Sequence, residues 1–128
     1  MSYLTEKDLQ DIIKDGKDIP NDVTEIETLK GYTGKLPEKL RWIGNLDSFN
    51  GVLPKELKEI GNLNCFIGLL PEGLKEIWNL GSYSGILPEG LEWIGNLNSY
   101  KGELPNKLKY INKSCSYKGM LPKGVELN

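Results

Sequence analysis

The sequence predicts a repeat solenoid, a fold in which short units of one length stack on each other along an axis. All seven prolines fall on one 17-residue grid that runs from Pro20 to Pro122. In units counted from residue 19, position 14 is always aromatic and position 16 is always glycine. Because every unit keeps this register, residues 19–128 are expected to form six full 17-residue repeats plus a C-terminal stub.

Residues 1–18 precede the grid and are predicted to form an N-terminal helical cap. Thr5 is the expected N-cap, and Asp8 is its partner in a capping box. Leu4 and Leu9 flank the helix start in the spacing of a hydrophobic staple. Gly16 is the expected end of the helix. A helix with this apolar face would cover the open core of the first repeat.

The first half of each repeat is predicted to be a short helical or 3-10 turn. In the second repeat, Leu36, Leu40 and Ile43 occupy positions 1, 5 and 8, a spacing that places them on one helical face. The proline at position 2 suits the first residue of a helix, and Gly44 at position 9 offers a stop.

The second half of each repeat is predicted to contain one strand. Positions 14, 16 and 1 of the next repeat are aromatic, glycine and leucine, as in Phe49, Gly51 and Leu53, and this period of two is typical of a half-buried strand. A strand through positions 10–14 is the alternative. In either case stacking gives a parallel β-sheet on one side and helical turns on the other.

The aromatic residues at position 14 form a column that could face the core or the solvent. We expect it to face the core, because all six repeats keep an aromatic side chain there whereas a binding stripe would vary along the array. This aromatic column comprises Tyr32, Phe49, Phe66, Tyr83, Tyr100 and Tyr117.

The run from Gly85-Ile86-Leu87-Pro88 to Gly95-Asn96-Leu97 resembles leucine-rich repeat proteins. The repeat LPxxLxxIGNLxxYxGx is most similar to the short LPxxL repeats of bacterial and phage type, although 17 residues is fewer than the usual ~20–29. The resemblance implies recognition of another protein by an extended face of the solenoid.

Composition argues against several classes of function. The chain has no histidine, so it lacks the base of a Ser-His or Cys-His dyad and every imidazole metal ligand. We therefore expect no enzyme activity, no metal and no cofactor. The lysines of residues 101–128 are accompanied by no arginine and are weak evidence for nucleic acid, so we expect no nucleic-acid partner. No apolar run reaches the ~18 residues of a membrane span. Two cysteines three repeats apart are expected to be free thiols, as in the cytoplasm.

Two groups of apolar residues stand at positions that other repeats fill with polar ones. The sequence predicts a small intracellular protein-binding module of the inhibitor or adaptor type; the alternative is a structural protein that assembles with itself into homo-oligomers. The second group is a binding patch only if positions 15 and 17 face outward, since core packing under a loop is the other reading. The candidate protein-binding residues are Trp42, Trp93 and Tyr110 at position 7, Val52, Leu69 and Ile86 at position 17, and Ile67 at position 15.

Overall fold

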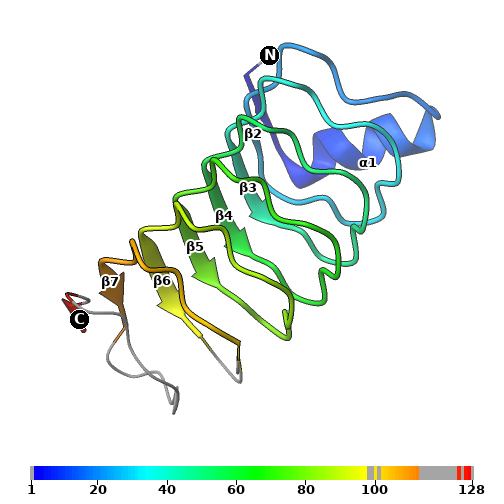
Figure 1. Cartoon of the computed structure of the whole chain (residues 1–128). Helices are drawn as coiled ribbons and strands as arrows, with labels where there is room; N and C mark the ends of the chain where they lie inside the picture. Colours follow the sequence, from blue (N-terminus) through cyan, green and yellow to red (C-terminus); the bar gives the residue numbers. More distant parts are fainter. Residues whose placement is uncertain (1, 98–99, 101, 113–123, 125, 128) are drawn as a thin grey trace.

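A computed structural model describes residues 2–97, 100, 102–112, 124 and 126–127. These residues form a parallel β-solenoid whose single eight-stranded sheet follows the order of the chain. Figure 1 shows the strands in one row along one side, with the rest of each coil looping back on the other side. The strands are β1 (Tyr3–Leu4), β2 (Glu25–Ile26), β3 (Trp42–Asn45), β4 (Glu59–Asn62), β5 (Glu76–Asn79), β6 (Trp93–Asn96), β7 (Tyr110–Ile111) and β8 (Glu126–Leu127).

The register of the sheet follows the sequence repeat, because paired residues of the long strands are 17 residues apart. Ile43 pairs with Ile60, and Ile60 pairs with Ile77, so equivalent positions of successive repeats lie side by side. These isoleucines are fully buried, and the leucines at positions 5 and 11 are buried with them in one continuous core.

The strands β3 to β6 occupy positions 7–10 of their repeats, and β2 and β7 occupy positions 7–8, so both strand placements predicted from the sequence are wrong. In β3, Ile43 points into the core, and the half-buried Trp42 belongs to the outer face. The Gly-Asn pair that ends each long strand resembles a turn signal, which hid the strand from sequence reasoning.

A helical turn over positions 2–8 does not form. The backbone N–H of Leu40 donates to the carbonyl of Pro37 at 3.2 Å, and the same single turn recurs from Pro54 to Leu57. Neighbouring coils are one strand spacing apart, ~4.8 Å, whereas helices pack at ~8–10 Å. A β-turn fits this rise on both sides of the stack, whereas a helix in every coil would bend the stack into an arc with the strands on its inner side.

A second tight turn follows the strand at position 12. Asp47, Asn64 and Gly81 occupy this position with φ of 51°, 49° and 58°, in the left-handed region that Asp, Asn and Gly tolerate best. The backbone N–H of Asp47 also donates to Oδ1 of Asn45 at 2.9 Å, which supports the turn.

The aromatic column faces the core, as predicted, in every repeat that the structure describes at this position. The rings of Tyr32 and Phe49 stack at a centroid distance of 6.5 Å, and those of Phe66 and Tyr83 at 6.3 Å. All of them are buried. Tyr117 lies outside the described residues.

Position 16 must be glycine because of this column. A Cβ built on Gly68 would lie 2.7 Å from the ring of Phe66, which is itself fully buried and cannot move aside. The prediction that position 14 points inward and positions 15 and 17 point outward is therefore correct, although none of the described strands includes this segment.

Helix α1 (Glu6–Lys14) begins and ends as predicted and lies at the N-terminal end of the stack (Figure 1). The N–H of Asp8 donates to Oγ1 of Thr5, and the N–H of Thr5 donates to Oδ2 of Asp8. At the other end, Gly16 has a φ of 67° and its N–H donates to the carbonyl of Ile13. Leu9 is fully buried in the core. The protection of the first coil by this helix stays a prediction.

Candidate functional site: a sheet face and an aliphatic ridge

The outer face of the sheet carries a row of large side chains at position 7. Strand pairing sets Trp42 beside Glu59, Glu59 beside Glu76, and Glu76 beside Trp93. Tyr110 of β7 pairs with Trp93 and extends the row. The predicted residues Trp42, Trp93 and Tyr110 therefore share one face, but two glutamates separate Trp42 from the other two.

The aromatic side chains of this face contact one another. Trp78, at position 9, meets Trp93 edge to face at a centroid distance of 4.6 Å, and Tyr3 of β1 stacks on Trp42 at 6.2 Å. The ring of Trp42 lies over Gly44, where an added Cβ would come within 2.9 Å of it. The glycine predicted to stop a helix instead makes room for an aromatic ring in the middle of a strand.

Two half-buried carboxylates lie between these aromatic groups. The indole Nε1 of Trp78 donates to Oε2 of Glu59 at 2.7 Å. Burial, followed by the nearby charge of Glu59, raises the pKa of Glu76 above its ordinary value, and the charge of Glu92 adds to the effect. Glu59 and Glu76 therefore lie between aromatic side chains on the outer face of the sheet.

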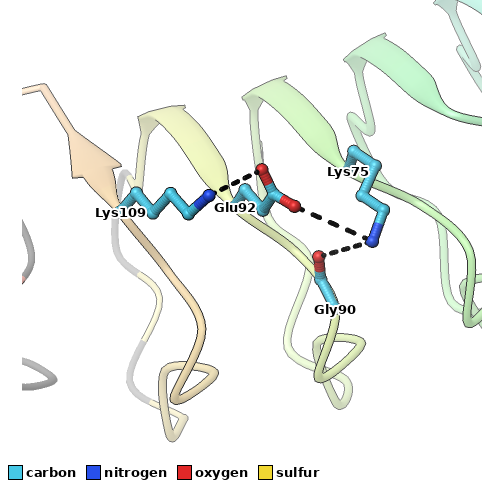
Figure 2. A network of polar contacts seen from close by, with 4 residues as sticks. All are labelled: Lys75, Gly90, Glu92 and Lys109. Carbon is cyan, nitrogen blue, oxygen red and sulfur yellow. Dashed lines mark hydrogen bonds and ion pairs between the residues drawn. The ribbon is translucent and has the colours of Figure 1, made fainter.

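A third glutamate, Glu92 at position 6, has a different environment (Figure 2). Its carboxylate lies 3.8 Å from Nζ of Lys75 and 3.4 Å from Nζ of Lys109, so it bridges lysines of the preceding and following coils. Lys75 also donates to the carbonyl of Gly90 at 3.4 Å. Lys75 and Lys109, both at position 6, therefore contact Glu92, and Lys75 also contacts the backbone of a turn.

A second surface lies on the limb of the coil that returns from the sheet. Its aliphatic ridge is exposed to solvent, so the reading of these residues as core under a loop is wrong. The ridge consists of Val52, Ile67, Leu69 and Ile86, which are 87%, 82%, 88% and 84% exposed.

Grooves run beside the ridge between successive coils. A groove of about 890 Å³ lies between the segment around Lys35 and the segment around Val52. Another, of about 560 Å³, is lined by Leu69, Ile86 and Glu89. Apolar ridges bordered by grooves suit insertion of a partner's side chains.

Sequence reasoning missed Tyr3, Glu59 and Glu76 as members of the sheet face. Only the correct strand position shows that they share a face with the tryptophans. Cys65 is an exposed free thiol, and Cys115 lies outside the described residues. Within the described ranges, no group of three or more His, Cys, Asp or Glu residues could hold a metal, and no helix is long and apolar enough to cross a membrane.

Comparison with known proteins supports the fold. No protein family model matches the chain, and no curated protein matches it. Among solved structures, CroV588, described as a novel circular leucine-rich repeat protein, has a TM-score of 0.57 and 21% sequence identity. The match covers 84% of this chain but only 20% of CroV588, so the chain spans about a fifth of that protein's length. The likeness shows that this chain has a leucine-rich-repeat-like solenoid fold.

Proposed function

We propose that this chain is a small intracellular protein-binding module, acting as an inhibitor or adaptor without catalysis. The observation that carries the proposal is the aliphatic ridge, in which four branched side chains are each more than four-fifths exposed. Burying one such side chain is worth about 1.5–3 kcal/mol, so a partner that covers the ridge gains a substantial binding energy.

The fold supports the same conclusion. Leucine-rich-repeat-like solenoids commonly serve as scaffolds for protein interaction, because stacked repeats present long continuous surfaces. Here the core needs none of the ridge side chains, since the residues at positions 5, 8, 11 and 14 fill it. The exposed Cys65 thiol suits the reducing interior of a cell.

The test compares two double variants in a pull-down from the native cell, with partners identified by mass spectrometry. Leu69→Lys with Ile86→Lys puts two charges on the ridge. Asn21→Lys with Asn106→Lys adds the same charges at exposed positions that line neither groove, and Lys55 occupies the equivalent position in another repeat. Both should keep the parent's circular dichroism. We expect the ridge variant to lose a partner that the control variant retains.

A partner captured equally by both variants would contradict the role of the ridge. Light scattering on the purified protein separates the alternative, self-assembly. If the protein forms oligomers that the ridge variant abolishes, then a second copy of the chain, and not another protein, covers the ridge.

A further inference from the structure

The sheet face holds two neighbouring carboxylates for which the described residues provide no cation within salt-bridge distance. Glu59 and Glu76 are paired across β4 and β5, one strand spacing of ~4.8 Å apart. Among the described residues, neither forms a salt bridge, whereas Glu92 has two lysines within 4 Å. Like charges opposed across strands destabilise a sheet. The indole of Trp78 bonds to Glu59, but no described cation lies within salt-bridge distance of either carboxylate to balance their repulsion.

The lysines nearest in sequence are directed elsewhere. Lys75 contacts Glu92 and the carbonyl of Gly90. Nζ of Lys58 lies near Gly73, where an added Cβ would be 3.1 Å from it. Lys58 and Lys75 thus extend toward the turn of the next coil, which leaves the outer face of β4 and β5 negative.

Aromatic rings flank the two carboxylates on both sides. The chain has three tryptophans, Trp42, Trp78 and Trp93, and all three belong to this face. Trp78 contacts both the aromatic rings and the carboxylates, because its ring packs against Trp93 and its Nε1 donates to Glu59. Carboxylates beside tryptophan faces form an environment that attracts cations by ion pairing and by cation–π interaction together.

We propose that the sheet face formed by Trp42, Glu59, Glu76, Trp78 and Trp93 binds an arginine side chain presented by a protein partner. A guanidinium is planar and carries five donors, so one group can bond to two adjacent carboxylates while it stacks on an indole. Lysine has a compact and strongly hydrated charge, so it can pair with the carboxylates but cannot stack on an indole as a planar guanidinium does. The inference rests on the proposed function and names the chemistry of the partner.

Tryptophan fluorescence tests the inference directly, because all three reporters lie on the proposed site. Three short peptides are titrated into the protein at low salt. They are otherwise identical and uncharged, and they contain two arginines, two lysines or two norleucines. We expect a saturable change with the arginine peptide, weaker binding of the lysine peptide, and none of the norleucine peptide. The arginine response should fall as salt increases.

Matched charge variants localise the effect. Glu59→Gln with Glu76→Gln should weaken arginine-peptide binding by about tenfold or more, because it removes both carboxylates. Glu56→Gln with Glu72→Gln removes the same net charge from exposed positions off the sheet and should change the affinity by less than about twofold.

No saturable response, equal weakening by the two variants, or equal affinity for the arginine and lysine peptides would each overturn the proposal. The ridge variant Leu69→Lys with Ile86→Lys separates it from the proposed function. If the ridge variant loses a native partner while the arginine peptide fails to bind the parent protein, the proposed protein-binding function is supported and the arginine site is wrong.

Discussion

The sheet face and the aliphatic ridge both expose large apolar side chains, but they relate differently to the fold. On the sheet, Trp93 packs on Trp78 at 4.6 Å and Trp78 bonds to Glu59 at 2.7 Å. On the ridge, less than a fifth of each side chain is covered by the rest of the chain. Exposed apolar residues of a solenoid therefore need to be divided into those that also support the fold and those that do not.

The largest effect is expected beneath the ridge. Gly68→Val would force a side chain into the buried ring of Phe66, so we expect loss of cooperative folding or at least about 3 kcal/mol of destabilisation. Gly90→Val is the control, because other repeats carry lysine or glutamate at that position. Chemical denaturation measures both. A stable Gly68→Val protein would show that the limb under the ridge is not closely packed.

A slightly smaller loss is expected in the aromatic column. Tyr83→Ala should cost about 3 kcal/mol, as large-to-small changes do in a core. Tyr83→Phe removes only the hydroxyl that donates to the carbonyl of Ile86 at 2.9 Å and should cost about 1 kcal/mol. Denaturation midpoints distinguish the two. A cost below about 1 kcal/mol for the alanine variant would be incompatible with a core role.

The comparison itself is tested by one substitution on each surface. Trp93→Ala should lower the free energy of unfolding by about 1 kcal/mol, because it removes an aromatic pair. Ile86→Ala should stay within about 0.5 kcal/mol of the parent, as exposed substitutions do. If urea denaturation gave equal costs, the two surfaces would not differ in their contribution to folding.

The smallest effect concerns Glu76 and pH. Because the pKa of Glu76 is raised in the fold, the folded state holds this proton more tightly than the unfolded state. That stabilisation is complete below the ordinary pKa of 4.5 and is lost as pH rises through the raised value. Glu76→Gln should therefore melt higher than the parent at neutral pH, and the difference should shrink toward pH 4.

The exposed Glu72→Gln variant provides the control for that pH series. Melting curves of Glu72→Gln should differ little from the parent at each pH. A neutral-pH gain as large as that of Glu76→Gln would indicate relief of general negative charge rather than of the pair on the sheet.

The architecture could be predicted from the sequence because its period is simple, and the position of the strand could not. Proline, isoleucine and the aromatic residue mark every coil, and the inward direction of the aromatic residue follows from its invariance and from the alternation of positions 14–17. The segment Trp42–Asn45 contains glycine and asparagine, which favour turns in isolation, and it pairs because its neighbours repeat it. Asp47, Asn64 and Gly81 at position 12 were an available signal for the turn that ends the strand.

The candidate site shows the same division. Val52, Leu69 and Ile86 could be identified because they depart from a polar pattern, whatever the strand position. Glu59 and Glu76 match the common residue at position 7, so nothing in the sequence distinguishes them from solvated glutamates. Their significance depends on the tryptophans beside them, and only the register of the sheet reveals those neighbours.

The 17-residue register also fixes the distances between equivalent side chains in multiples of one strand spacing. Removing residues 53–69 would join Val52 to Leu70 in phase and take out one whole coil together with Glu59. Trp42 and Trp93, now three strand spacings or ~14 Å apart, would then be separated by two spacings, or ~10 Å. Gains and losses of single coils thus change the distance between binding groups in fixed steps while each coil stays intact. A partner that contacts both tryptophans would detect the number of repeats between them.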